Sequence, residues 1–142
     1  MASMSDYLEG QLRTHLFRTG SFTKPTVLAV ALLTAASADA DTGATGGKEV
    51  ANAGAYARQT LNPLDANWTA ASSTDGLTDN ASAITFPVAT ANWGTITHLW
   101  IVDSATYGAG NVLFHGALTS SVIINSGGQL IINVGDLNIV WA

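Results

Sequence analysis

The sequence predicts a mainly β protein, a jelly-roll-like antiparallel β-sandwich preceded by an N-terminal helix. Its second half is a series of short apolar segments separated by glycine-rich turns at intervals of about 8 to 12 residues, a pattern typical of sandwiches and barrels. Helical periodicity is confined to the first 20 residues. The 142 residues show no internal repeat and no change of composition that would mark a boundary, so we expect a single domain over residues 1–142.

The first 20 residues are predicted to form a helical arm. Asp6 is the expected N-cap, and Glu9 three residues later completes the pattern of a capping box. Leu8, Leu12 and Leu16 recur at every fourth position and form a narrow apolar stripe. An isolated helix of this length is marginally stable in water, so we expect the stripe to dock on the sheet or on a neighbouring subunit.

The next segment, residues 26–36 (TVLAVALLTAA), is apolar on both faces and is predicted to be a buried strand. It is too short to cross a bilayer, which needs roughly 20 residues, and we expect no membrane partner. Residues 37–55 are rich in Ala, Asp, Thr and Gly and are predicted to form a long loop. A short strand is expected at residues 56–61.

Further strands are predicted through the rest of the chain. They cover residues 67–71, 83–86, 95–103, 111–118, 121–125, 129–133 and 137–141. Residues 126–128 (SGG) separate two isoleucine-rich runs. This pattern predicts a hairpin, because glycine readily adopts the positive φ that such turns require.

Charge is scarce and unevenly placed. Only 11% of the residues are charged, and all five Lys and Arg residues precede residue 59. Residues 59–142 contain five aspartates and no Lys or Arg, so they carry the whole formal net charge of −5. We expect other subunits to cover much of this surface, although a hydrated surface rich in Thr, Ser and Asn is the alternative. The acidic balance argues against a nucleic-acid partner.

No motif in the sequence predicts catalysis. Cysteine is absent, which excludes a disulfide, a thiolate zinc site and a cysteine nucleophile. His98 and His115 fall on neighbouring predicted strands, but the spacings of zinc ligands and of serine hydrolases are missing. Residues 39–43 (DADTG) are similar to the start of a calcium loop, yet Val50 occupies the position of the bidentate glutamate. We therefore expect no enzyme, no cofactor and no metal site.

The aromatic residues offer a different kind of candidate. Trp68, Trp93 and Trp141 are large apolar side chains of the type that anchors interfaces, and Trp68, Trp93 and Tyr107 could form a platform on which sugars stack. The alternative is packing in the core, which we expect for Trp100.

Several blocks of the chain, taken together, resemble a family of short virion structural proteins of tailed bacteriophages. The blocks are residues 5–9 (SDYLE), 26–36, 49–50 (EV), 56–59 (YARQ), 84–87 (ITFP), 91–98 (ANWGTITH) and 111–118 (NVLFHGAL). Members of this family are labelled either as tail-fibre proteins or as head decoration (cement) proteins. The resemblance implies a virion component and no catalytic residue.

Between these two roles, the compact chain favours capsid cement. A fibre is usually long or repetitive, whereas a cement protein is a rigid domain with extensions that cross subunit boundaries. We expect a cement protein on the capsid exterior, assembled in the host cytoplasm, that binds the major capsid protein and itself as a homodimer or homotrimer. The alternative is a tail or tail-fibre-associated module that binds a receptor or glycan.

The candidate interface residues follow from these arguments. The arginines among them are expected to pair with acidic groups of a partner. The set is Leu8, Leu12, Arg13, Leu16, Arg18, Arg58, Trp68, Trp93 and Trp141.

Overall fold

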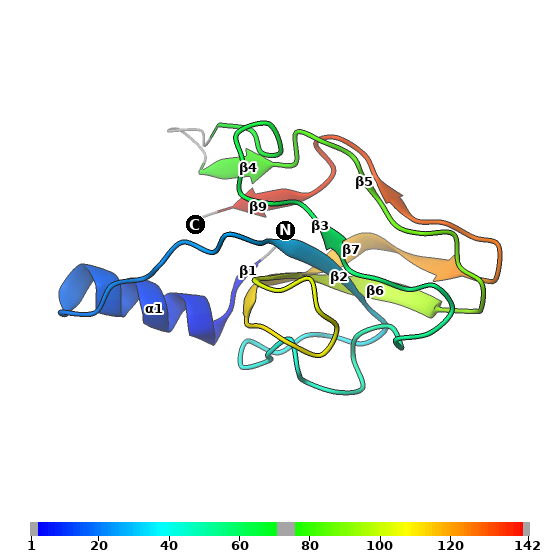
Figure 1. Ribbon diagram of the computed structural model, residues 1–142, viewed down its shortest axis with the longest axis horizontal. Coiled ribbons are helices and arrows are strands. Elements are labelled where there is room, and N and C mark those ends of the chain that lie inside the picture. The colour runs from blue at the N-terminus through cyan, green and yellow to red at the C-terminus, as the bar shows by residue number, and fades with distance from the viewer. Residues whose placement is uncertain (1–2, 71–75, 141–142) are drawn as a thin grey trace.

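The computed structural model describes residues 3–70 and 76–140 (Figure 1). One helix and nine strands are assigned in this part of the chain. Their order is β1 (Ser3–Met4), α1 (Asp6–Phe17), β2 (Ala29–Leu33), β3 (Gln59–Thr60), β4 (Leu77–Asp79), β5 (Ile84–Thr85), β6 (Gly94–Val102), β7 (Val112–Ile124), β8 (Ile131–Ile132) and β9 (Asn138–Val140). The predicted mainly β class, with antiparallel sheets and one N-terminal helix, is confirmed.

The main layer is a five-stranded antiparallel sheet in the order β1-β7-β6-β2-β3. Strands β6 and β7 follow each other in the chain and form its long central hairpin. Strand β2 lies beside β6, with Ala29 opposite Val102 and Leu33 opposite His98. All five residues of β2 are buried. This confirms the buried strand that the two-faced apolar run at residues 26–36 predicts.

One face of this sheet is covered by two smaller sheets, β4-β9 and β5-β8 (Figure 1). Side chains from both layers, such as Leu32, Ile96 and Ile101 on one side and Phe86 and Ile139 on the other, share one hydrophobic core. Sheets of five, two and two strands are less regular than the jelly rolls of about eight strands. The layered packing is that of a β-sandwich.

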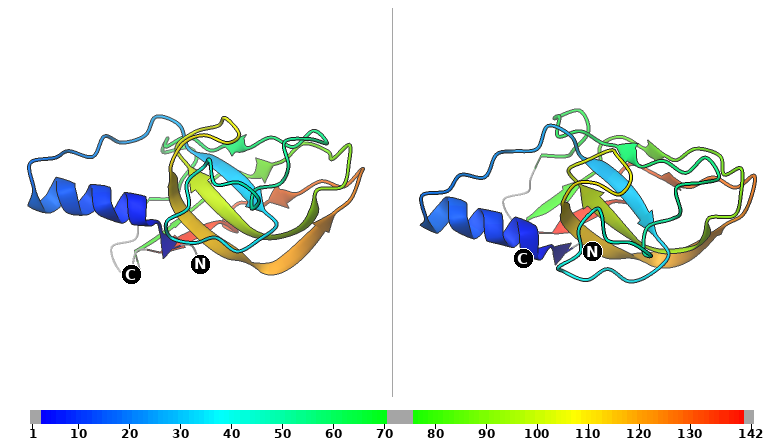
Figure 2. Two further views of the ribbon diagram at one scale, coloured as in Figure 1. Left: turned by 90° about the horizontal axis from the view of Figure 1, so that it is seen from below. Right: turned by 60° about the horizontal axis from the view of Figure 1, so that its bottom comes forward.

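The opposite face of the main sheet is covered by irregular chain. Loop residues 37–55, predicted as a loop, run beneath the sheet with the 103–111 turn (Figures 1 and 2). Trp100 lies in a second apolar cluster on this face and donates its indole N–H to Ser37 Oγ at 2.6 Å. The prediction that Trp100 packs in the core is confirmed, since it is fully buried.

Three predicted strand details are wrong. The two strands expected at 111–118 and 121–125 are one strand, β7, whose pairing with β6 slips between Ile96–Val122 and His98–Ala117. The SGG turn is present, with Gly127 at φ +85°, but its flanking strands do not form a hairpin because β8 pairs with β5. Residues 67–70 make only an isolated bridge between Trp68 and Asn80, and position 71 lies outside the described residues.

Candidate interaction site

The base of the N-terminal arm is built into the body. Strand β1 pairs with β7, and the backbone N–H of Ser5 donates to the Leu113 carbonyl at 3.0 Å. Ser5 is the N-cap of α1, which corrects the predicted Asp6: its side chain accepts from the Leu8 N–H at 3.3 Å and donates to the Val112 carbonyl. Leu8 is buried in the core and Leu12 packs against it. The arm therefore leaves the body in a fixed direction.

The tip of the arm, residues 13–20, projects from the body (Figure 2). Every residue of this segment is exposed. Leu16 is 69% exposed and Phe17 is 81% exposed, the highest value among the large apolar side chains of the described residues. Beyond the helix the chain returns toward β2, and the Phe22 N–H donates to His15 Nδ1 at 3.3 Å. The last turn of α1 thus presents two apolar side chains to solvent.

A small apolar pocket lies between the two layers, near the base of the arm. Its volume is about 210 Å³. Phe114, one of its lining residues, pairs with Met4 of β1, which places the pocket beside the start of α1. The other apolar side chains that line it are Leu28, Trp68, Ile101, Leu113 and Ile139. We call this hollow the apolar pocket.

Next to the apolar pocket is a more polar hollow that shares Pro63 and Trp68 with it. Asp65 and Lys24 line this second hollow, and Lys24 Nζ donates to the Pro63 carbonyl at 3.3 Å. Trp68 donates its indole N–H to the carbonyls of Leu61 and Asn62, both at 3.2 Å. Trp68 is half-buried, so only part of the ring is available to a partner.

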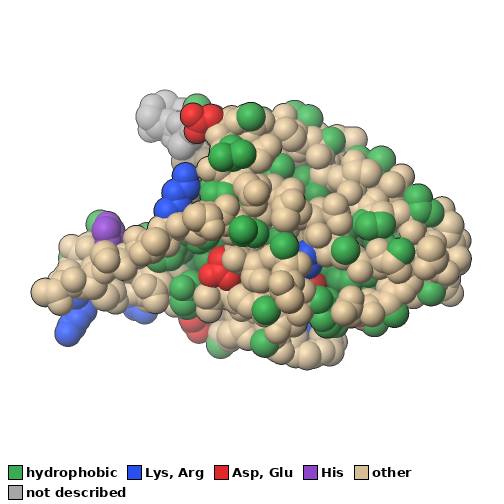
Figure 3. All heavy atoms as spheres, in the orientation of Figure 1, with side chains coloured by type: hydrophobic (Ala, Val, Ile, Leu, Met, Phe, Trp, Pro, Cys, Tyr) green, Lys and Arg blue, Asp and Glu red, His purple; other side chains and the backbone are tan. Residues whose placement is uncertain are grey.

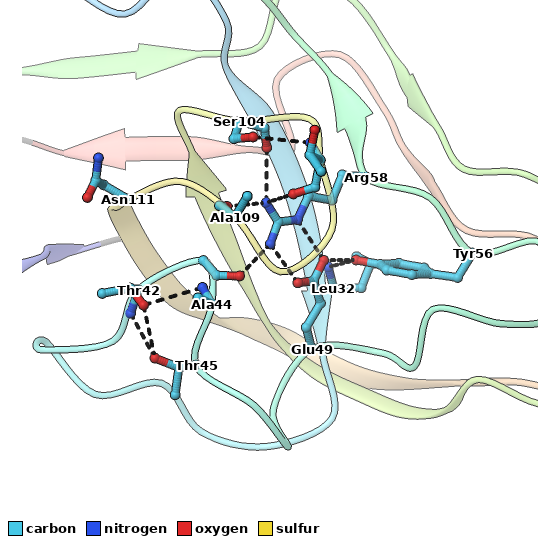
Figure 4. A network of polar contacts seen from close by, with 12 residues as sticks. Leu32, Thr42, Ala44, Thr45, Glu49, Tyr56, Arg58, Ser104, Ala109 and Asn111 are labelled. Carbon is cyan, nitrogen blue, oxygen red and sulfur yellow. Dashed lines mark hydrogen bonds and ion pairs between the residues drawn. The ribbon is translucent and has the colours of Figure 1, made fainter.

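Arg58 lies inside the protein, which corrects its assignment to an interface. Its side chain pairs with Glu49 through two N–H···O contacts of 2.7 and 2.8 Å (Figure 4). The remaining guanidinium donors reach four loop carbonyls at 2.8 to 3.0 Å, those of Gly43, Ser104, Thr106 and Ala109. The acidic partner of Arg58 is thus in its own chain.

Tyr56 extends this buried network toward β2. Its hydroxyl donates to Glu49 Oε1 at 2.9 Å and accepts from the Leu32 N–H at 3.0 Å. Burial raises the pKa of the Tyr56 hydroxyl, and the Glu49 carboxylate raises it further. The hydroxyl therefore remains a proton donor. The network holds the loops together through hydrogen bonds within the chain.

The residues similar to a calcium loop are used internally. Asp41 Oδ2 pairs with Lys48 Nζ at 2.6 Å and accepts from the Ala38 N–H at 2.7 Å. Burial alone would raise the pKa of Asp41, but these hydrogen bonds hold it below the ordinary value. Among the described residues, no group of three or more His, Asp or Glu side chains is arranged to hold a metal ion.

The two strand histidines do not meet. His98 lies opposite Ala117, and His115 lies opposite Trp100. His98 Nδ1 contacts Thr97 Oγ1 at 2.9 Å. His115 Nε2 is 2.8 Å from Asp39 Oδ1, although the contact is poorly aligned for a hydrogen bond. These residues form no shared site.

The predicted aromatic platform is also not assembled. Trp93 is buried in the core and donates its indole N–H to the Gly54 carbonyl at 2.8 Å, so it is not available to a partner. Tyr107 packs edge-on against Tyr56, on the side of the loops. Trp68 lines the apolar pocket instead. The structure therefore gives no stacking surface made from all three side chains.

Of the predicted interface residues, only those of the arm lie close together on one element. Leu8 and Leu12 hold its base, whereas Arg13, Leu16 and Arg18 lie on its exposed tip. Trp141 lies outside the described residues. Sequence reasoning missed Phe17 because it falls off the four-residue stripe, and it missed the apolar pocket because its lining comes from distant segments. In the described part of the chain, no helix is both long and apolar enough to span a bilayer.

Comparison with known protein families identifies the family of this chain. A search of curated proteins found none that matches this chain. A family model described as "Podophage GP4 fiber I protein gp80" matches residues 3–140, which is nearly the whole length. The match takes in the arm, the loops around Arg58 and both layers of the sandwich. The chain therefore belongs to this family of bacteriophage structural proteins.

Proposed function

We propose that this protein is a structural subunit of a phage fibre, and not an enzyme. Its β body acts as a rigid unit, and its N-terminal arm attaches that unit to a neighbouring subunit of the virion. The exposed arm tip is the observation that carries the proposal. Leu16 and Phe17 are held out from the body by a base whose capping serine and leucine are buried.

The physical argument rests on the contrast between base and tip. An apolar side chain gains free energy when it leaves water, and Phe17 gains almost none within its own chain. A helical turn surrounded by solvent is also weakly stable by itself. A partner that covers the tip would remove both disadvantages. The family description, which names a fibre protein, favours a fibre as the place where that partner is found.

A capsid cement role is the second candidate. It is supported by the compact single domain and by the charge-poor surface after residue 58, which suit a subunit packed among others on the capsid exterior. Its partner would be the major capsid protein. The family description supports the fibre more than the capsid, so we rank cement second.

The two roles are separated by locating the protein on the virion. Antibody-gold labelling of intact phage should mark the fibres at fixed positions. Labels distributed over the whole head would support cement instead.

Attachment through the arm is tested in phage that carry Phe17→Ser. The amount of this protein in purified virions should fall strongly, because the apolar contact with the neighbouring subunit is lost. The variant should still fold, since Phe17 is exposed. Val88→Ser is the matched control, since Val88 is a half-exposed apolar residue of the body. Normal incorporation of the Phe17→Ser protein would show that the tip is not the attachment point.

A further inference from the structure

The arm tip exposes an aromatic side chain, and the apolar pocket is a hollow lined mostly by apolar side chains. We infer that Phe17 at the arm tip of one copy inserts into the apolar pocket of a second copy of this chain. This inference rests on the proposed attachment role of the arm and names the partner as the protein itself.

The size of the pocket suits an aromatic ring. An apolar cavity of about 150 Å³ is enough to hold benzene, and the apolar pocket measures about 210 Å³. The residues that line it are apolar except for Thr78 and the indole N–H of Trp68, which already donates to the Leu61 and Asn62 carbonyls. Three of them, Ile101, Leu113 and Ile139, are buried in the core.

The distribution of charge favours a second copy as the occupant. The arm tip, residues 13–20, contains Arg13 and Arg18 and no acid, whereas residues 59–142 contain five aspartates and no Lys or Arg. Figure 3 shows blue basic side chains on the projecting arm. Asp65 is exposed in the hollow that adjoins the apolar pocket. An arm docked on a second body therefore brings unlike charges together, which steers association.

The position of the pocket permits a closed dimer. The pocket lies beside the base of the arm, so two antiparallel copies can each place a tip in the pocket of the other. A reciprocal exchange of this kind satisfies the two-fold symmetry of most homodimers. If each copy instead inserted its tip into the pocket of a different copy, the same contact would link the copies head to tail.

The main competing surface for self-association is the outer edge of β7. In the described residues, β1 pairs with Phe114 and His115, and β7 carries no charged residue from Gly116 through Ile124. Uncharged edge strands can pair with other chains. A β7-to-β7 contact would not involve the arm, and the experiment below distinguishes it.

The test measures the molar mass of the purified full-length protein by analytical ultracentrifugation over a range of concentrations. The native protein should be a dimer. Phe17→Ser should weaken association by about tenfold or more, as expected from the loss of one buried aromatic side chain at each contact. Val88→Ser should associate like the native protein. A native protein that stays monomeric, or a Phe17→Ser protein that dimerises normally, would overturn the inference.

A mixing experiment tests the two halves of the contact. Thr78→Phe fills the apolar pocket with a residue that strands accept well, and this variant should also associate about tenfold or more weakly than the native protein. A mixture of Phe17→Ser and Thr78→Phe proteins should associate more tightly than either variant alone, because the first supplies an open pocket and the second supplies Phe17, which restores one of the two contacts. If the mixture associates no more tightly than either folded variant alone, the tip and the pocket do not bind each other.

Cross-linking provides a readout that does not depend on filling the pocket. The chain has no cysteine, so Phe17→Cys and Thr78→Cys proteins can be mixed and oxidised. A disulfide-linked mixed dimer should form faster than with Val88→Cys in place of Thr78→Cys, and equal rates would contradict the contact. If self-association fails but Phe17→Ser still removes the protein from virions, the self-contact is wrong and the attachment role stands.

Discussion

Arg58 connects segments that are far apart in the sequence. Its guanidinium bonds Glu49 and the carbonyls of two loops, 41–47 and 104–109, while its backbone leads into β3. The arginine has five donors in a fixed planar arrangement, which matches this set of acceptors. A buried ion pair with satisfied donors fixes one arrangement of the loops that cover the main sheet.

Replacing Arg58 with Met should therefore destabilise the protein strongly. Glu49 would remain buried without its charge partner, and breaking such a pair typically costs about 3–5 kcal/mol of unfolding free energy. Urea unfolding followed by circular dichroism measures the loss. Arg13→Met is the matched control, because Arg13 is exposed on the arm, and its effect should stay within about 0.5 kcal/mol. Similar losses for both variants would contradict the role of Arg58.

Gly43 provides a second test at the scale of a residue. A Cβ at this position would lie 2.1 Å from the Ala109 carbonyl oxygen, a backbone atom that Arg58 also binds. Gly43→Ala should cost about 1–3 kcal/mol through overpacking. Gly46→Ala is the control in the same loop, since nothing lies within 4 Å of its added Cβ. Equal thermal stability of the two variants would show that the loop can move away.

The stability of the loop should also depend on pH through Asp41. Its pKa in the folded protein is below the ordinary value of 3.8, so its ionised form stabilises the fold. That contribution is fully present above the unfolded pKa and is lost as the pH falls through the folded pKa. Unfolding between pH 5 and pH 2 should therefore show a smaller loss of stability for Asp41→Asn than for the native protein. If the unfolding free energies of the two proteins fall in parallel with decreasing pH, Asp41 does not stabilise the fold through its ionised form.

In helix α1, the local sequence pattern predicts the helix correctly but predicts the wrong N-cap residue. The leucine spacing predicts the helix, but the residue that caps it is chosen by tertiary contacts. Ser5 is buried against β7 and bonds both the helix and the Val112 carbonyl, whereas Asp6 is exposed. Both residue types are good N-caps, and the local capping-box pattern with Glu9 favours Asp6, so the choice of Ser5 depends on its contacts with β7.

Ser5→Ala should accordingly lower the unfolding free energy by about 1–2 kcal/mol, from the lost cap and the lost bond to β7. Asp6→Ala should change it by a few tenths of a kcal/mol, through the helix dipole alone. Chemical denaturation of both variants measures the difference. A larger loss of unfolding free energy for Asp6→Ala than for Ser5→Ala would show that Asp6 is the N-cap, as the capping-box pattern predicts.

For the strands, the sequence pattern predicts burial but does not predict which strands pair. The two-faced apolar run around β2 identifies the centre of the sheet because burial on both faces leaves a plain signal. The partner of a strand leaves no such signal. The SGG turn is compatible with a hairpin, yet β8 pairs with β5 because that pairing completes the second layer. Long-range pairing depends on the whole fold.

The same limit applies to the candidate site. The arm could be predicted from its periodicity, and its basic residues could be read directly from the sequence. Residue type alone predicts an interface role for Trp93 and Arg58, because tryptophan and arginine are common there, but the folded chain buries both side chains. The apolar pocket draws on β4, β6, β7 and β9 and on two loops, so it exists only in the folded chain.

At the scale of the whole molecule, the structure divides the protein into a charge-poor body and a basic arm tip. The body is stabilised by two hydrophobic clusters and by the Arg58 hydrogen-bond network. The tip is held by the body but covered by nothing in the described chain. This division is suited to a subunit that works in an assembly, as expected for a member of a family of bacteriophage structural proteins.

The most direct test of this account is the number of copies of the protein in each virion. Quantitative mass spectrometry of purified phage gives that number relative to the major capsid protein. A fibre subunit should be present at a small multiple of the number of fibres, far below the major capsid protein. A ratio close to that of the major capsid protein would contradict the fibre assignment and support capsid cement.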